Sequence, residues 1–147
     1  MFWQRLSSMK KIYLLILLIG IQNTVLAESF SMKCKFINGQ STQFESSLPK
    51  TKQVKDFPEL IFDQIDTDKG TARLIGNIGA ETIQAIKGER VINLYEITQI
   101  GNVNITTIFM SEDTQNNNLF PVVHSRHIAL KSGPIPSQYV GTCLRIF

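Results

Sequence analysis

Short runs of β-forming residues, separated by turn-forming residues, recur along almost the whole of this chain. About nine such runs follow residue 29 at a spacing of roughly 8–14 residues, and they are rich in Val, Ile, Thr and Phe. They lie at 30–36, 42–45, 60–65, 71–75, 81–86, 91–98, 103–110, 122–130 and 139–147. Only at 80–87 does a helix compete with a strand. Because this spacing comes with no sustained helical period, the sequence predicts an all-β domain built as an antiparallel meander.

The turns of this meander are predicted from Gly, Asn, Asp and Pro. Asn38-Gly39 is a strong hairpin dipeptide and predicts the end of the first strand. The polar, proline-containing stretch 46–58 is predicted to be a loop, and its lysines at 50, 52 and 55 are interpreted as solvated. The segment 133–136, Gly-Pro-Ile-Pro, is expected to lead into the last strand.

The two cysteines favour a closed sheet. Cys34 lies in the first predicted strand and Cys143 in the last, and two cysteines in a small exported domain usually pair. A disulfide needs Cα atoms about 5.5 Å apart, so the terminal strands would have to be neighbours. First and last strands are neighbours in an up-and-down barrel. We therefore expect a lipocalin-like or avidin-like barrel of about 8–9 strands, with a β-sandwich as the alternative.

The N-terminal residues have the layout of a secretory signal peptide. Two lysines precede the apolar run 12–21, and Val25 and Ala27 fit the −3 and −1 positions of a cleavage site. Ten residues span about 15 Å as a helix, half the thickness of a hydrocarbon core. We therefore expect a signal peptide at 1–27 and a single β domain at 28–147, periplasmic or secreted in a Gram-negative bacterium.

The basic character of the chain resides in that signal. The whole chain has net charge +3, but Arg5, Lys10 and Lys11 precede residue 28 and the exported part holds 12 basic and 12 acidic residues. The only tryptophan, Trp3, also lies in the signal. We therefore expect no nucleic-acid partner, and contact with a membrane only through the signal peptide.

One cluster of titratable residues suggests a site. His124-Ser125-Arg126-His127 lies in a predicted strand, where residues three apart point to opposite faces, so the two histidines cannot share a metal ion. Glu96 lies in the apolar run 91–98; if it faces inward, its natural partner is Arg126 or His124 in a buried ion pair. We predict a buried polar cluster of Glu96, His124, Arg126 and His127, with no metal, no cofactor and no catalytic residue.

Three segments of the C-terminal half resemble a group of small exported bacterial proteins of uncharacterised activity. They are Thr-Thr-Ile-Phe at 106–109, His-Ser-Arg-His at 124–127 and Pro-Ser-Gln-Tyr-Val-Gly-Thr-Cys at 136–143. The resemblance implies bacterial export and a compact β domain, and it brings no catalytic residue with it.

These observations favour a non-enzymatic barrel of the cell envelope that binds a small apolar ligand or a protein partner. An enzyme that uses Glu96 with His124 or His127 is the first alternative. A small outer-membrane barrel is the second, because Leu144, Ile146 and Phe147 resemble the end of such a chain. That alternative requires a continuous apolar band on the outer surface.

Overall fold

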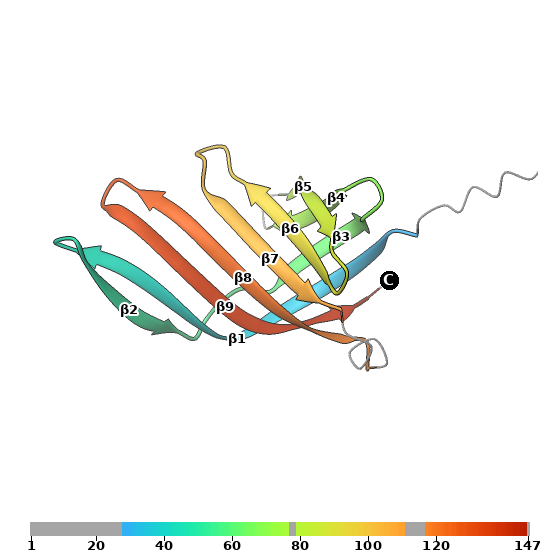
Figure 1. Ribbon diagram of the computed structural model, residues 1–147, viewed down its shortest axis with the longest axis horizontal. Coiled ribbons are helices and arrows are strands. Elements are labelled where there is room, and N and C mark those ends of the chain that lie inside the picture. Colours follow the sequence, from blue (N-terminus) through green and yellow to red (C-terminus); the bar gives the residue numbers. More distant parts are fainter. Residues whose placement is uncertain (1–27, 77–78, 111–116, 147) are drawn as a thin grey trace, which may run out of the picture.

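The protein is a closed antiparallel β-barrel with one additional strand (Figure 1). The computed structural model describes residues 28–76, 79–110 and 117–146, so the predicted signal peptide at 1–27 lies outside the described residues. The strands are β1 (Phe30–Glu45), β2 (Leu48–Val54), β3 (Leu60–Asp66), β4 (Thr71–Gly76), β5 (Gly79–Lys87), β6 (Val91–Ile97), β7 (Val103–Phe109), β8 (Leu119–Leu130) and β9 (Gly133–Arg145). The predicted all-β barrel is confirmed, and the sandwich and the helix at 80–87 are excluded.

Strand β1 closes the barrel because it is long enough to have different neighbours along its length. Its first half pairs with β3 and its second half, from Gly39, pairs with β2. On its other side it pairs with β9 from Met32 to Ser41. Strands β1 and β3–β9 therefore form a barrel of eight strands, and β2 continues the sheet beyond it.

The predicted turn at Asn38-Gly39 is wrong, because the chain stays extended there. Strand β1 instead accommodates one extra residue, Ile37, in a β-bulge between Phe36 and Asn38. Gly39 is required for close packing and not for a turn, because the Tyr139 ring of β9 lies directly against its backbone. A Cβ atom at position 39 would lie 2.3 Å from that ring. The hairpin comes eight residues later, at Ser46 and Ser47, which both have positive φ as a two-residue turn of this type requires.

Two segments predicted as loops are strands. The stretch 46–58 contains β2, whose Pro49 and lysines are typical of a protected edge strand. Strand β9 begins at Gly133 and includes Pro134 and Pro136. These prolines are tolerated because β9 has lost its pairing with β1 beyond Ser137, so its one remaining neighbour is β8.

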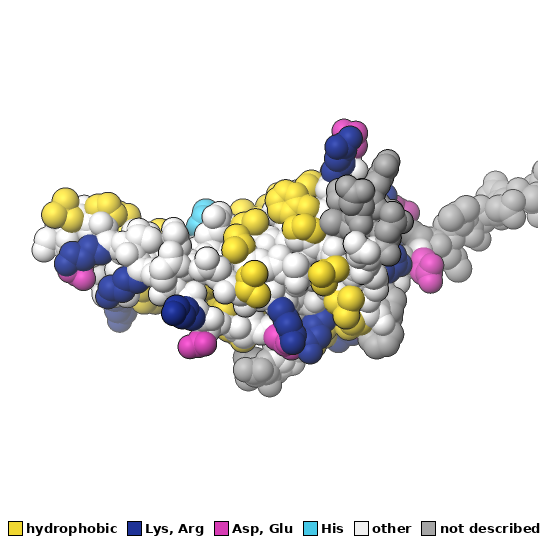
Figure 2. Space-filling view, turned by 90° about the horizontal axis from the view of Figure 1, so that it is seen from below, with side chains coloured by type: hydrophobic (Ala, Val, Ile, Leu, Met, Phe, Trp, Pro, Cys, Tyr) yellow, Lys and Arg dark blue, Asp and Glu magenta, His cyan; other side chains and the backbone are white. Residues whose placement is uncertain are grey.

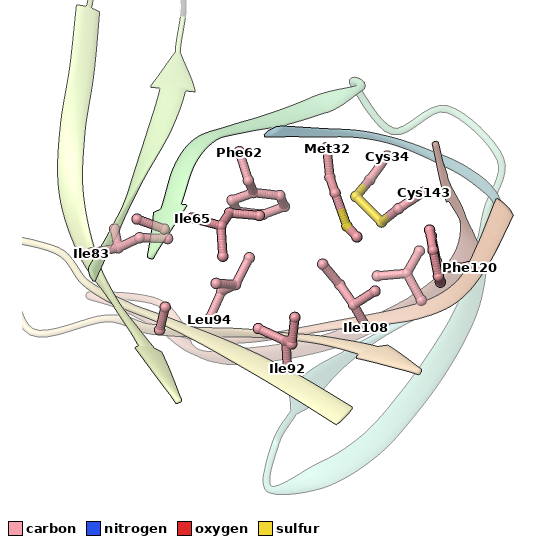
Figure 3. Close-up of a cluster of buried hydrophobic side chains, with 13 residues drawn as sticks. Met32, Cys34, Phe62, Ile65, Ile83, Ile92, Leu94, Ile108, Phe120 and Cys143 are labelled. Carbon is pink, nitrogen blue, oxygen red and sulfur yellow. A yellow bond between two sulfur atoms is a disulfide. The ribbon is translucent and has the colours of Figure 1, made fainter. Parts of the chain in front are cut away.

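The core lies in the barrel interior and consists of inward-pointing side chains from nearly every strand (Figure 3). The largest of those that are fully buried include Phe62, Met32 and Ile65. Cys34 and Cys143 lie directly opposite each other on β1 and β9 and form a disulfide within this core, as predicted. The bridge therefore joins the two strands whose pairing closes the barrel.

Part of the sheet projects beyond the barrel. The β1–β2 hairpin and the β8–β9 hairpin run side by side to the left of Figure 1, where the other strands have ended. We call residues 39–54 and 126–138 the wing. At about 3.3 Å per residue, the six residue steps from Gly39 to Glu45 extend it by about 20 Å.

Candidate functional site

The inner surface of the sheet changes from apolar to polar in successive rows of side chains, which run across the strands. Directly paired residues point to the same face, so each row can be read from the register. The deepest row consists of Ile92, Ile108, Val122, Gly141 and Phe36. The next row consists of Leu94, Thr106, His124, Tyr139 and Gly39. The outermost row consists of Glu96, Asn104, Arg126, Ser137, Ser41 and Lys52.

A cavity of about 240 Å³ lies at the barrel end where the polar rows begin. Its floor and apolar walls come from Phe62, Leu74, Ile83 and Leu94, together with Leu60 and residues 57–58 of the β2–β3 loop. Its polar lining consists of Glu96, Asn104, Thr106, His124 and Arg126. The cavity is therefore amphipathic: apolar at depth and charged toward the wing.

His124 forms the polar wall of the cavity as a neutral imidazole. Its side chain is 4 % exposed, and its Nδ1 shares a hydrogen bond of 2.8 Å with the Thr106 hydroxyl. Burial, and to a lesser extent the positive charge of Arg126, lowers the pKa of His124 to about 4. Near neutral pH this side chain therefore acts as a hydrogen-bonding wall and carries no charge.

Glu96 and Arg126 lie two strands apart in the outermost row, with Asn104 between them. Asn104 Nδ2 donates a hydrogen bond of 2.6 Å to Glu96 Oε2. Asn104 Oδ1 is buried and is the one such side-chain polar atom without a hydrogen-bond partner among the described residues. A buried unsatisfied acceptor costs about 1–3 kcal/mol, so a ligand or water that donates to it would be favoured.

An aromatic side chain from the β2–β3 loop packs against the polar wall of the cavity. The ring centre of Phe57 lies 4.1 Å from that of Tyr139, 5.3 Å from that of His124 and 5.1 Å from that of Phe36. The guanidinium carbon of Arg126 lies 5.7 Å from the same ring centre, within the range of a cation–π contact. Phe57 thus closes over the polar wall with its face toward the cationic side chain.

Three of the four residues predicted as a polar cluster line this cavity. Glu96, His124 and Arg126 do so, whereas His127 is exposed on the outer face, as the alternation along β8 requires. The ion pair suggested for Glu96 is not formed: among the described residues, neither Arg126 nor His124 bonds to this carboxylate. Asn104 takes that place because it is the direct cross-strand neighbour of Glu96.

Several lining residues were missed by sequence reasoning. Asn104 and Thr106 are two apart in β7 and therefore share the inner face, and this spacing could have identified them. Phe57 could not be identified in this way. It enters from a loop, where no periodicity indicates which way a side chain points.

A second hollow, of about 480 Å³, lies at the opposite end of the barrel, between residues such as Phe30, Val91 and Met110. It is larger than the first, but its rim adjoins 111–116, which lie outside the described residues. The smaller cavity is the better candidate site because its lining is described completely and combines a buried apolar floor with converging polar groups.

Charged side chains interrupt the outer surface of the barrel. Glu59 forms ion pairs with Lys33 at 2.6 Å and with Lys35 at 3.0 Å, and Asp63 pairs with Arg73 on the next strand. The continuous outward apolar band that the outer-membrane alternative requires is therefore broken on β1, β3 and β4. In the part of the chain that the structure describes, no helix is long and apolar enough to cross a membrane, and no three potential metal ligands cluster.

Comparison with models of protein families, with curated proteins and with solved structures finds no match to this chain.

Proposed function

We propose that this protein is an exported, non-enzymatic binding protein whose barrel holds a small, largely apolar ligand. The observation that carries the proposal is the amphipathic cavity of about 240 Å³. An apolar cavity of about 150 Å³ is large enough to bind benzene. The cavity therefore suits a ligand with one ring or a short chain, and its polar rim suits a head group that both donates and accepts hydrogen bonds.

Binding is a better account of this cavity than catalysis. Glu96 already accepts a hydrogen bond from Asn104, and His124 is neutral and bonded to Thr106. His127 lies on the opposite face of β8 and cannot take part. Export is supported by the predicted signal peptide and by a disulfide that is compatible with an oxidising compartment.

The proposal is tested with benzyl alcohol, which combines one apolar ring with a hydroxyl head. We expect saturable shifts of methyl signals in an NMR titration of residues 28–147. Leu74→Trp should abolish them by filling the cavity from its half-buried edge. Ile100→Trp, on the exposed β6–β7 turn, is the matched control and should bind normally. Absence of saturable binding, or equal binding by the Leu74→Trp variant, would contradict the proposal.

The charges of the rim predict a preference among head groups. Among the described residues, Arg126 has no carboxylate within ion-pair distance. Glu96, in contrast, already accepts a hydrogen bond from Asn104. We therefore expect benzoate to bind more tightly than benzylamine, which has a similar body and the opposite charge. Arg126→Gln should remove the preference while retaining benzyl alcohol binding. A preference for the amine would show that Glu96 dominates the rim.

A further inference from the structure

The wing concentrates positive charge in a domain that is neutral as a whole. Its residues, 39–54 and 126–138, include four basic side chains and one acidic side chain, while the remainder of 28–147 has eight basic and eleven acidic side chains. The wing therefore has net charge +3, and the remainder of 28–147 has net charge −3. Its one carboxylate, Glu45, is paired with Lys50. Such segregation favours an anionic partner at the wing.

Large apolar side chains stand exposed at the ends of both hairpins. Leu48 is 68 % exposed and Phe44 41 % exposed beside the β1–β2 turn, and Leu130 is 48 % exposed beside the β8–β9 turn. Figure 2 shows hydrophobic side chains at the left end of the molecule, with basic side chains close behind them. The two hairpins come close at this end, where residues such as Phe44 and Ile135 line one shallow hollow.

We propose that the wing docks on a lipid bilayer that contains anionic phospholipid, with both hairpin tips inserted among the head groups. Leu48, Phe44 and Leu130 would enter the interface, and Lys50, Lys52 and Lys131 would meet lipid phosphates. Exposed apolar residues flanked by lysines are the combination that binds such surfaces. The proposal is independent of what the cavity binds.

A bilayer fits the wing better than an acidic protein does. Paired strands β1 and β9 separate beyond Ser41 and Ser137, so the end of the wing is two narrow tips with a hollow between them. A stable protein interface needs roughly 800 Å² of complementary surface on each partner. A fluid head-group layer requires no such complementarity and can surround each tip separately.

Docking at the wing would bring the cavity mouth toward the membrane. The outermost polar row runs without interruption from Glu96 and Arg126 at the cavity to Lys52 on β2. An apolar ligand leaving the bilayer would therefore meet a continuous inner face that leads to the cavity.

The test is flotation of residues 28–147 with vesicles of phosphatidylethanolamine and phosphatidylglycerol, compared with vesicles of phosphatidylcholine. We expect binding to the anionic vesicles that weakens as salt rises, and at least tenfold weaker binding to the neutral ones. Leu48→Ser combined with Leu130→Ser should weaken binding to the anionic vesicles by about tenfold or more. Lys50→Glu combined with Lys52→Glu should abolish the preference for anionic lipid.

Control variants change exposed residues outside the wing. Ile100→Ser removes a side chain that is 76 % exposed, and Lys87→Glu reverses an exposed charge on β5. Both should float as the unaltered protein does, and circular dichroism should show every variant folded. No binding to the anionic vesicles at low salt, or equal losses in control and wing variants, would overturn the proposal. Anionic-vesicle binding that is lost only in the wing variants would support it.

Discussion

Gly141 is the residue on which the contact between the first and last strands depends most closely. A Cβ atom at this position would lie 1.9 Å from the carbonyl oxygen of Lys35 and 2.7 Å from Cα of Phe36. Both atoms belong to the backbone of β1 and cannot turn away as a flexible side chain would. The absence of a side chain at Gly141 is therefore what lets β9 approach β1 beside the bulge.

Replacing Gly141 with alanine should lower the free energy of unfolding by about 2–3 kcal/mol, because backbone must move to make room. Urea denaturation measures this loss. Gly76→Ala is the control, since its Cβ would meet nothing closer than 3.6 Å, and it should change stability by less than about 0.5 kcal/mol. Equal effects of the two substitutions would mean that β1 and β9 are not held this closely.

His124 should make the stability of the protein depend on pH. Its pKa is lowered from 6.5 to about 4 in the folded protein, so between these values the unfolded chain takes up a proton that the folded protein does not. The free energy of unfolding therefore falls as the pH falls through this range. Between pH 7 and pH 4.5 the contribution of this one group is about 2–3 kcal/mol.

His124→Gln should remove that contribution, so urea denaturation at pH 7 and pH 4.5 should show a smaller acid-induced loss than in the unaltered protein. His127→Gln, on the solvent-exposed outer face, is the matched control and should behave as the unaltered protein does. An unchanged acid-induced loss in the His124→Gln variant would show that the histidine is not held neutral.

The sequence was informative about single residues where strand alternation applies. Alternation predicted that His124 and His127 point to opposite faces, yet the predicted cluster included both; Glu96, His124 and Arg126 line the cavity and His127 does not. The sequence did not indicate that Asn104 stands between Glu96 and Arg126, because the register decides which residue of β7 lies opposite them. The partner of this half-buried carboxylate therefore could not be identified from one strand alone.

At the scale of elements, strand β1 shows why sequence signals can mislead. Asn38-Gly39 has the composition of a hairpin turn, yet Gly39 is extended and lies under the Tyr139 ring. A glycine can also be needed for close contact with a distant residue, here Tyr139, which is 100 positions away. The sequence around Gly39 carries no pattern that indicates such a contact. The six strands from β3 to β8 were located within a few residues because hairpins between neighbours are encoded locally.

The disulfide should contribute strongly because it joins the elements that close the barrel. It links residues 109 positions apart, and in the chain-entropy account a loop of about 100 residues corresponds to about 4.7 kcal/mol. Cys34→Ala combined with Cys143→Ala should therefore lower the free energy of unfolding by about 3–5 kcal/mol. A reductant should destabilise the unaltered protein comparably and leave the double variant unaffected. Full stability of a fully reduced protein would contradict this role.

At the scale of the whole molecule, the structure changes the meaning of a net charge of zero. Twelve basic and twelve acidic residues balance over 28–147, and this balance predicted no contact with anionic surfaces. The fold places the β1–β2 and β8–β9 hairpins side by side and thereby collects the excess of positive charge at one end. Composition could not show this, because the segregation depends on which hairpins the closure of the barrel brings together.

We propose above that the cavity between the apolar core and the wing holds a small ligand. The most direct measurement is the set of NOEs between the ring protons of bound benzyl alcohol and assigned methyl groups of the protein. We expect contacts to Ile83 and Leu94, which line this cavity. Contacts to Val91 and Met110 at the opposite end of the barrel, or none to any inward methyl group, would contradict it.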